Sequence, residues 1–538
     1  MFGSLRLDHR SIKWLIATIL SATAFLYLPS FSLGFISDDF ALIGEARRVS
    51  WWGLFLQELN AYYRPLVQLT LKADHALWGS KPAGYHVTSF ALHLINVLLV
   101  ALIGRRVLSR KGWILAAVYF GITPTHASSV LWICGRTDLL CATFYLGTAW
   151  MLIESKARRE MWHGAIVALL TFGALLSKEM AISLPLVSLL IAYAIERRDG
   201  HALRDSAVAV APIFCAFVLY IALRFALFGN FLQNPLQTAT STSAILTNVA
   251  RYAVTLTFPL DLEILKPFFR SHPNLLLGAS VVIAGGCIYF ARSIGRDRTL
   301  LVLLGCVALS LIPVLRVFGP WYLYIPSVGV ALFVGRAFEL VERGIKRKAA
   351  ISWALVLLLG LQISGLGQRQ LWAFRAGKLT SEAIETLAVN VDAGNRVAVL
   401  SLPTEYRGVP VFGWLGNLEY AMHLFDHDIG PLTAVGVRLS GSTVETETIV
   451  ESSKKIRMSI SGETDFFRLH DLRLLTGARK PAPGQIYNVR DATVEVVRLN
   501  ASGQPAEVVV TPRTFGLRGD VKIFAFRGSG LQEITVGR

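Results

Sequence analysis

Long apolar runs alternate with short polar connections over the first two thirds of the chain. A transmembrane helix needs about 20 mostly apolar residues, and several of these runs are shorter than that. The pattern still predicts an α-helical polytopic membrane protein with about eleven transmembrane helices. The candidate spans are residues 13–31, 86–104, 112–123, 138–154, 163–177, 181–195, 206–227, 274–291, 299–317, 321–339 and 349–367.

The pattern changes after residue 367. Charge rises, and β-branched runs stand between turn signals, as is typical of strands. We therefore expect residues 1–367 to form a membrane domain and residues 368–538 a small β-rich or α/β domain. The predicted strands are "RVAVLSLP" (396–403), "ATVEVVRL" (492–499), "AEVVVTP" (506–512) and "VKIFAF" (521–526).

Composition agrees with a membrane protein. Hydrophobic residues make up 53% of the chain and charged residues 17%, whereas a soluble domain has roughly a quarter charged residues. The net charge of +17 would suggest nucleic acid in a soluble protein, but no nucleic-acid partner is expected here because the basic residues sit between apolar runs. The five cysteines lie in or beside apolar runs and show neither metal-ligand spacing nor a disulfide framework.

The basic clusters predict the orientation. Cytoplasmic loops are enriched in Lys and Arg, and the spans alternate correctly when all clusters lie in the cytoplasm. The amino terminus is then expected inside, as an uncleaved anchor, and residues 368–538 outside. The clusters are Arg105, Arg106, Arg110 and Lys111; Lys156, Arg158 and Arg159; Arg197, Arg198 and Arg204; Arg292, Arg296 and Arg298; and Arg343, Lys346, Arg347 and Lys348.

Two outer segments are expected to lie along the membrane surface. Residues 32–85 contain "SWWGLFLQEL" (50–59), whose aromatic and apolar residues suit an interfacial helix. Residues 244–270 are apolar enough to cross, but a crossing would place the cluster at 292–298 outside. We interpret 244–270 as a re-entrant or interfacial segment.

Two adjacent carboxylates, Asp38 and Asp39, follow the first span in "FISDDFAL" (35–42). One of them could cap the helix that "FALIGEA" predicts. A cap does not explain the second acid. Two carboxylates at a membrane surface can bind a cation, or one can act as a base while the other orients it.

A polar stripe marks the second span. His86, Ser89, His93 and Asn96 are spaced by three, four and three residues, which places them on one helix face. Such a stripe faces the bundle interior or a wet cavity. It could equally be a set of structural hydrogen bonds between helices.

Further ionisable residues gather at the outer ends of the spans. Arg64 lies in "YYRPL" (62–66), and the next outer connection carries His126, Arg136 and Asp138; a salt bridge between Arg136 and Asp138 is the structural alternative. Lys178 and Glu179 form part of "LSKEMAISLP", where an interfacial pair reaching to water is the alternative. Together these residues predict a site at the outer face with carboxylates and cations. Cations suit a phosphate, and a carboxylate suits a hydroxyl nucleophile.

The motifs carry a resemblance in their order along the chain. They are "DDF", "YYRPL", "GYHVTSFALHLINVLL", "PTHASSVLWICGRTDLLCATFYL", "LLSKEMAISLPL" and "WYLYIPSVG". Over about residues 10–375 the chain resembles the GT-C superfamily of polyprenyl-phosphate-sugar glycosyltransferases. It is most similar to the protein O-mannosyltransferases and to the transmembrane O-mannosyltransferases with tetratricopeptide tails. Residues 368–538 show no such tail, so the acceptor preference of that branch is not transferred.

The resemblance implies an activity and roles for residues. Members move a sugar from an undecaprenyl or dolichyl phosphate to a hydroxyl acceptor at the outer membrane face. The family's acidic pair falls on Asp38, expected as the base, and Asp39, expected to orient it or to touch a metal. Candidates for the carrier phosphate are Arg64, Arg136 and Lys178; candidates for sugar or acceptor contacts are Tyr63, His86, His126, Asp138 and Glu179.

The resemblance also implies partners and a location. A divalent cation (Mg²⁺, Mn²⁺ or Zn²⁺) is the one cofactor it suggests, with Asp39, Glu179 and His126 as candidate ligands. The expected partners are a polyprenyl-phosphate-linked sugar, membrane lipid, and a protein, lipid or glycan acceptor, and the expected location is a bacterial plasma membrane. Two alternatives stay open: a glycan polymerase or ligase that uses a lipid-linked donor, and a transporter or lipid flippase, for which we would expect charged midplane residues and two related halves.

Overall fold

The structure is a computed structural model. The residues that it describes are 9–59, 62–154, 161–196, 202–230, 241–257, 297–344, 348–392, 396–413, 416–427, 432–439, 445–452, 455–461, 482–489, 492–499, 505–512, 521–527 and 530–534.

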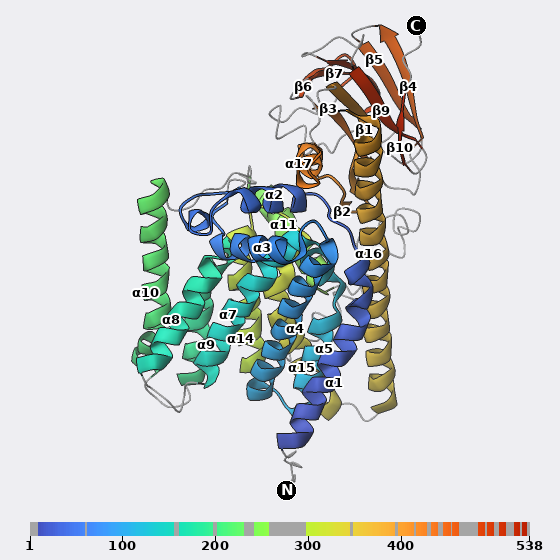
Figure 1. Ribbon diagram of the computed structural model, residues 1–538. Helices are drawn as coiled ribbons and strands as arrows, with labels where there is room; N and C mark the ends of the chain where they lie inside the picture. The colour runs from blue at the N-terminus through green and yellow to red at the C-terminus, as the bar shows by residue number, and fades with distance from the viewer. Residues whose placement is uncertain are drawn as a thin grey trace. The chain divides into compact units, whose positions relative to one another are not determined.

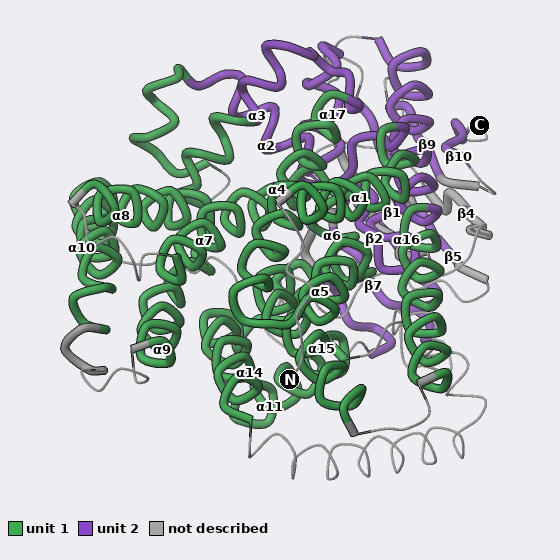
Figure 2. The backbone as a smooth tube through the Cα atoms, turned by 90° about the horizontal axis from the view of Figure 1, so that it is seen from below, with its two compact units in different colours: residues 1–31, 50–70, 84–370 green, residues 32–49, 71–83, 371–538 purple. Residues whose placement is uncertain are grey.

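The chain divides into two compact units (Figure 2). Unit 1 consists of residues 1–31, 50–70 and 84–370, and unit 2 consists of residues 32–49, 71–83 and 371–538. Two segments that follow the first apolar helix in sequence therefore belong to the same unit as the C-terminal part of the chain. The acid pair lies in one of these segments.

Unit 1 is built from apolar helices that stand side by side (Figure 1). Every predicted span within the described residues is helical, and the predicted span at 274–291 lies outside them. Helix α5 packs against α1 and α15, and α9 packs against α7, α10 and α14. The helices are α1 (His9–Tyr27), α4 (Pro82–Val107), α5 (Arg110–Ile122), α7 (Arg136–Glu154), α8 (Met161–Leu175), α9 (Leu184–Glu196), α10 (Ala202–Phe228), α14 (Arg298–Leu311), α15 (Tyr324–Gly344) and the first part of α16 (Lys348–Asn390).

Length and hydropathy identify this chain as an integral membrane protein. Among the described residues, 5 helical stretches are long and apolar enough to cross a membrane: Arg10–Ser32, Pro82–Val107, Ser206–Phe228, Pro320–Arg343 and Ala349–Asn390. Shorter apolar helices are Trp162–Leu175, Glu179–Ile195 and Arg298–Val314.

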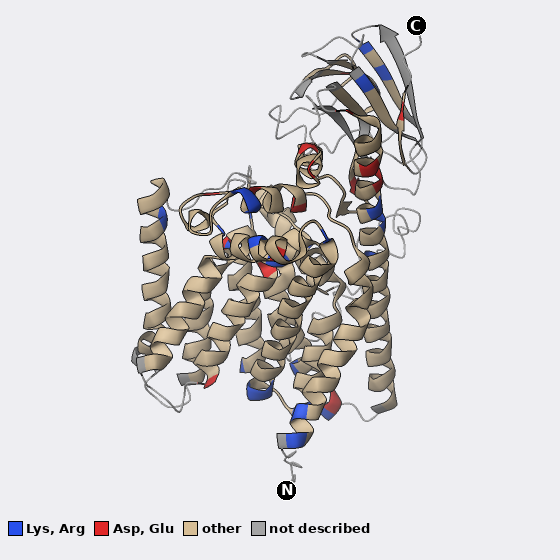
Figure 3. Cartoon of the chain, viewed as in Figure 1, with Lys and Arg blue, Asp and Glu red and all other residues tan. Residues whose placement is uncertain are grey.

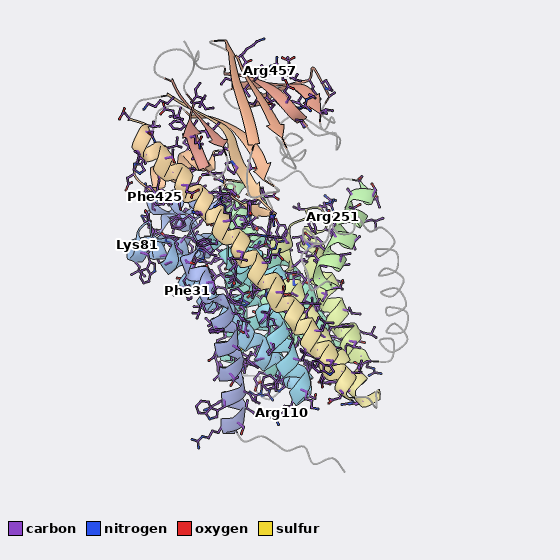
Figure 4. The ribbon with its side chains drawn as sticks, turned by 90° about the vertical axis from the view of Figure 1, so that its right-hand side faces the viewer. Phe31, Lys81, Arg110, Arg251, Phe425 and Arg457 are labelled. Carbon is purple, nitrogen blue, oxygen red and sulfur yellow. The ribbon has the colours of Figure 1, made fainter. Side chains whose placement is uncertain are left out.

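The two ends of the helices in unit 1 differ in charge. Figure 3 shows Lys and Arg at the lower ends of α1 and α4. Ion pairs Arg106–Glu154 and Lys111–Glu342 bring the end of α4, the start of α5 and the ends of α7 and α15 together there. Arg110, at this end, and Arg251 lie at opposite ends of the unit (Figure 4). The basic clusters predicted to share one side of the membrane therefore gather at one end where the structure describes them.

Small residues allow α5 and α15 to approach closely. A Cβ atom on Gly335 would lie 2.4 Å from the backbone oxygen of Gly112, which leaves no room for a side chain. Small residues serve the same purpose in many membrane helix pairs. Glu339 of α15 also accepts the backbone N–H of Ser109 at 2.6 Å, which satisfies a donor at the start of α5.

Short helices connect the spans at the end opposite the basic clusters. They are η2 (Gly53–Phe55), η3 (Pro124–His126), α6 (Ala127–Val130), η4 (Ile133–Gly135), η6 (Glu179–Ser183), η7 (Ile312–Val314) and η8 (Pro320–Leu323). The interfacial helix predicted over 50–59 is replaced by the single turn η2, where Ser50 Oγ accepts the N–H of Gly53. Trp52 and Leu56 are nevertheless exposed there, and an interfacial position of residues 50–59 stays a prediction.

Residues 244–257 of the predicted re-entrant segment belong to helix α11 (Thr242–Thr257), and residues 258–270 lie outside the described part. Asn248, Tyr252 and Leu256 share the buried face of α11 at a spacing of four. Asn248 Nδ2 donates to the backbone oxygen of Leu315 at 3.1 Å, so this face packs against the connection between α14 and α15.

Unit 2 contains two five-stranded sheets (Figure 1). In the first, β1 (Arg396–Tyr406) pairs in parallel with β3 (Leu432–Leu439) and β9 (Val521–Arg527), while β2 (Val409–Pro410) and β10 (Gly530–Glu533) add antiparallel edges. The second is antiparallel in the order β4 (Glu445–Ser452), β5 (Lys455–Ser461), β8 (Pro505–Pro512), β7 (Ala492–Leu499) and β6 (Ile486–Val489). All four predicted strands are confirmed as β1, β7, β8 and β9.

Alternation along the strands of the second sheet explains its core. Val494 and Val496 of β7 are buried, and the residues between and beside them are partly exposed. The same period of two places Ile456 and Met458 of β5 inside. Arg457, on the other face of β5 (Figure 4), bonds Glu507 of β8 at 2.7 Å.

Candidate active site

The acid pair of unit 2 opens helix α2 (Asp39–Arg48), and its two carboxylates have different surroundings. Asp39 is buried, and its Oδ2 accepts the backbone N–H of Ile36 at 3.0 Å. Asp38 occupies the N-cap position, yet its side chain makes no capping hydrogen bond. Asp38 is partly exposed. The helix cap predicted for one of the two acids is not formed: Asp38 makes no capping hydrogen bond, and Asp39 closes the turn before α2. Asp38 is the more exposed of the two carboxylates.

C-terminal residues of unit 2 fix the backbone of the loop at 33–38. Ser37, in the left-handed region at φ 51°, donates its N–H to the backbone oxygen of Val411 at 2.5 Å. Thr380 Oγ1 of α16 donates to the backbone oxygen of Phe35 at 2.7 Å. Gly413 has φ +60°, and a Cβ atom there would lie 2.2 Å from Ser37 Oγ. A side chain at 413 would therefore displace the residue that precedes Asp38.

The carboxylate of Asp38 is held by a side chain as well. Asn417, the first residue of helix α17 (Asn417–Leu424), donates from Nδ2 to Asp38 Oδ1 at 3.0 Å. Ser37 Oγ lies 3.4 Å from the same oxygen. The carboxylate therefore has a defined orientation, although its partner lies far away in sequence.

Two cations join α2 to its neighbours by capping helix ends. Lys72 Nζ donates to the backbone oxygens of Ala46, Arg47 and Val49, at 3.3, 3.0 and 2.7 Å, at the carboxyl end of α2. Arg47 donates to the backbone oxygen of His423 at 2.6 Å, near the carboxyl end of α17. Such caps satisfy carbonyls that have no partner within the helix. They hold α2 in place from its far end.

In unit 1, Arg64 and Glu179 form a bidentate pair. Arg64 donates from Nε to Oε1 and Oε2 at 3.2 and 3.1 Å, and from Nη2 to Oε2 at 2.7 Å. Its guanidinium also lies over the ring of Tyr62, 4.0 Å from the centroid. Burial alone would lower the pKa of Arg64, but the adjacent carboxylate raises it, so the guanidinium stays charged.

Arg64 still presents donors outside this pair. Its Nη1 makes no hydrogen bond to any residue that the structure describes. The side chain retains 14% exposure. A guanidinium can bind through one edge while the other donates elsewhere. Arg64 therefore can hold Glu179 and an anionic ligand together.

Lys178 and Asp138 form a buried ion pair. Lys178 Nζ lies 2.7 Å from Asp138 Oδ1, and each side chain is 3% exposed. The ammonium also lies over the ring of Tyr322, 4.8 Å from the centroid. Two structural alternatives from the sequence are thereby corrected. Asp138 pairs with Lys178 and not with Arg136. Lys178 and Glu179 do not act as one interfacial pair, because Lys178 bonds Asp138 and Glu179 bonds Arg64.

Arg136 is fully buried at the start of α7. It donates to the backbone oxygen of Tyr85 at 2.8 Å, to Ser89 Oγ at 3.2 Å and to Thr70 Oγ1 at 3.4 Å. Of the three cations predicted for the carrier phosphate, only Arg64 has appreciable exposure in its side chain.

Most of the polar stripe on α4 is used for packing between helices. His93 Nδ1 lies 2.7 Å from Tyr324 Oη, and Asn96 Nδ2 donates to the backbone oxygen of Leu139 at 2.9 Å. His86 is buried on the same face. His126 is also buried, with Nε2 at 2.7 Å from Ser327 Oγ and its ring against Phe120. The structure thus favours the structural alternative for His93 and Asn96.

Tyr63 lies beside a second cation that the motifs did not assign a role. Tyr63 is buried and donates its hydroxyl to the backbone oxygen of Phe55 at 3.0 Å. Arg224 lies 5.7 Å from the Tyr63 ring and pairs with Glu58 at 2.8 Å. No sequence pattern pairs Glu58 with the end of α10, because the two partners are 166 positions apart.

The predicted metal ligands do not fit a metal site. The carboxylate of Glu179 is paired with the guanidinium of Arg64. The ring of His126 is fully buried. Within the described ranges, no group of three or more His, Cys, Asp and Glu residues is arranged to hold a metal ion.

These features define an integral membrane protein with two polar sets: an oriented, accessible carboxylate in unit 2, and paired carboxylates and cations at one end of the helices of unit 1. A carboxylate of this kind can accept a proton from a hydroxyl. A partly exposed guanidinium can bind a phosphate.

Comparison with known proteins adds a family resemblance. No protein-family model matches the chain. It aligns with the protein O-mannosyl-transferase Tmtc1 of Drosophila melanogaster at 31% identity over 197 residues, covering 34% of this chain and 23% of that protein. TMTC3 of Mus musculus aligns at 25% identity over 205 residues, covering 35% and 22%. The predicted resemblance to O-mannosyltransferases is confirmed, although the chain spans less than a quarter of the length of these relatives.

Solved structures are similar at a lower level. ArnT from Cupriavidus metallidurans, bound to undecaprenyl phosphate, has a TM-score of 0.44 and 12% identity and covers 80% of this chain and 93% of that chain. The Archaeoglobus fulgidus oligosaccharyltransferase tethered to an acceptor peptide has a TM-score of 0.43 and 11% identity, with coverage of 78% and 64%. Similarity at this level says nothing about the residues of the site.

Proposed function

We propose that this protein is a GT-C glycosyltransferase that moves a hexose such as mannose from a polyprenyl phosphate to a hydroxyl acceptor at the outer membrane face. The observation that carries the proposal is the similarity to relatives named protein O-mannosyl-transferases. The apolar helices support a lipid-linked donor, because such a carrier lies in the bilayer. The names of these relatives describe transfer of mannose to protein, which supports a protein hydroxyl as the acceptor.

Asp38 is the base in the proposed reaction. The acceptor oxygen attacks the anomeric carbon, and its proton passes to the Asp38 carboxylate. The bond from that carbon to the phosphate oxygen breaks, and the polyprenyl phosphate leaves with the electron pair. One displacement inverts the anomeric centre, whereas covalent attack by a carboxylate would lead to retention. The partial exposure of Asp38 and its fixed orientation support this role over Asp39.

Arg64 binds the carrier phosphate in this proposal. Glu179 fixes one edge of the guanidinium, and the Nη1 donors face the ligand. Charge that develops on the leaving phosphate is stabilised by such a preorganised cation. Lys178 and Arg136 do not contact the phosphate in this proposal. Their bonds to Asp138 and to the backbone of Tyr85 stabilise the polar end of the helix bundle.

The direct test is transfer from a synthetic polyprenyl-phosphate mannose by the purified protein in lipid nanodiscs. We expect release of polyprenyl phosphate together with a new glycosidic bond on an acceptor peptide. Movement of the intact donor across the bilayer of proteoliposomes, with no bond cleaved, would instead identify a flippase. Extension of a lipid-linked glycan in place of the peptide would identify a polymerase.

Replacing Arg64 with alanine should weaken binding of the carrier. A hydrogen bond to a charged group contributes about 1.5–3 kcal/mol, so the Kd for polyprenyl phosphate should rise at least about tenfold. Arg110→Ala is the matched control, because it removes the same charge at the basic end, and α4 with its 26 residues separates the two ends by about 39 Å. Equal Kd values for the two variants would remove Arg64 from the phosphate site.

The orientation can be tested with single cysteines in a cysteine-free background. Gln532 of unit 2 and Lys111 of unit 1 are both exposed. An impermeant thiol reagent should label Gln532→Cys on intact cells, because the basic clusters favour the cytoplasm. Lys111→Cys should react only after permeabilisation. The reverse pattern would place the acid pair on the cytoplasmic side and contradict the proposed donor face.

A further inference from the structure

Asn417 of unit 2 lies directly against the carboxylate that the proposed function uses. It is fully buried. Its Nδ2 donates to the backbone oxygen of Phe412 at 2.7 Å and to Asp38 Oδ1 at 3.0 Å. An amide nitrogen carries two hydrogens, and both contacts are acceptors. The opposite amide orientation would place an oxygen against two acceptors, so chemistry fixes the orientation that is observed.

The position of Asn417 is itself determined by the fold. Asn417 opens helix α17, and Gly413, which follows β2, adopts φ +60° beside Ser37. The Nδ2 group of Asn417 thus makes two hydrogen bonds that have different roles. The bond to Phe412 anchors the amide to the residues that follow β2, and the bond to Asp38 extends from that anchor to the loop at 33–38.

We propose that Asn417 is a positioning residue for Asp38, which it holds in the orientation that receives the proton of the acceptor. This inference rests on the proposed function, in which Asp38 is the base. The amide does not exchange protons with the carboxylate, because it only donates a hydrogen bond. Its contribution is to restrict rotation of the carboxylate, so that the accepting oxygen meets each incoming hydroxyl at the same place.

Restricted rotation affects rate more than binding. A misplacement of about 1 Å at a reacting group can lower the rate about 100-fold. Binding of the carrier does not depend on this contact, because the amide of Asn417 bonds to Asp38 and to the backbone of Phe412. Loss of Asn417 should therefore reduce kcat while leaving the affinity for the carrier unchanged.

The test is a double-mutant cycle. Asn417→Ala should lower single-turnover transfer about 10- to 100-fold, with an unchanged Kd for polyprenyl phosphate. In an Asp38→Asn background the same substitution should cause no further loss, since the group that it positions has been removed. Tyr420→Phe is the control, because it removes a contact between α17 and α2, the 3.2 Å bond from Tyr420 Oη to Glu45, without touching Asp38. Tyr420→Phe should keep the normal rate.

A second variant covers a failure of Asn417→Ala to fold. Asn417→Leu keeps the branching of the side chain at Cγ and removes both donors, and it should give the same loss of rate. Normal turnover in a folded Asn417 variant, or an equal loss in both backgrounds, would overturn the inference and leave Asp38 as the base. Normal turnover in Asp38→Asn alone would overturn the proposed role of Asp38, and the inference with it.

Discussion

Asp38→Asn is expected to lower the rate of sugar transfer by at least about 100-fold while the carrier still binds normally. The substitution removes the proton acceptor and keeps the size of the side chain. The new amide oxygen can still accept the hydrogen bond from Asn417, so the loop at 33–38 should keep its shape. The measurement is single-turnover transfer from a synthetic lipid-phosphate sugar, with the Kd of the carrier determined separately.

Asp426→Asn is the matched control for this experiment. Asp426 belongs to the same unit, and its side chain is 83% exposed, with Arg47 as a partner at 3.3 Å. Its replacement should leave transfer unchanged. Near-normal turnover in Asp38→Asn would contradict the role as base. If Asp39→Asn were inactive and Asp38→Asn active, the base would be the buried acid instead.

Lys178→Met is expected to destabilise the protein by about 3–5 kcal/mol, because it leaves the carboxylate of Asp138 buried without its cation. Removing both charges with Lys178→Met and Asp138→Leu should cost much less, since no buried charge then remains. The measurement is the unfolding midpoint and free energy on titration with SDS in bicelles.

Lys111→Met serves as the comparison for Lys178→Met. Lys111 pairs with Glu342 in an exposed position, with 65% of the lysine side chain accessible. An exposed pair contributes about 0–1 kcal/mol. A similar small loss in Lys178→Met would show that the buried pair contributes little to stability.

The apolar and alternating patterns predicted most elements of the fold. A span of apolar residues and a period of two depend on local sequence, so the helices of unit 1 and strands β1, β7, β8 and β9 follow from them. The helix predicted over 50–59 is reduced to the single turn η2, which begins at Gly53. Length alone could not separate an interfacial helix from a turn there.

The sequence was enough to name candidate site residues but not to predict how they pair. Arg136 and Asp138 are close in sequence, yet residues two apart on a helix do not face each other. Lys178 and Glu179 are adjacent but point to different partners, which the packing of distant segments decides. Asn417 carried no sequence signal at all, because its proposed role depends on a contact with a residue 379 positions away in sequence.

Unit 2 is assembled from three separate segments of the chain, which limits how this protein can be recombined with its relatives. Residues 32–49 and 71–83 belong to one compact unit with the C-terminal part of the chain. A chimaera that exchanges only residues 371–538 would separate Ser37 from the Val411 oxygen and Gly413 that fit it. Functional exchange therefore requires three segments to be transferred as a set. A truncation before residue 411 likewise removes a support of the acid loop rather than an optional appendage.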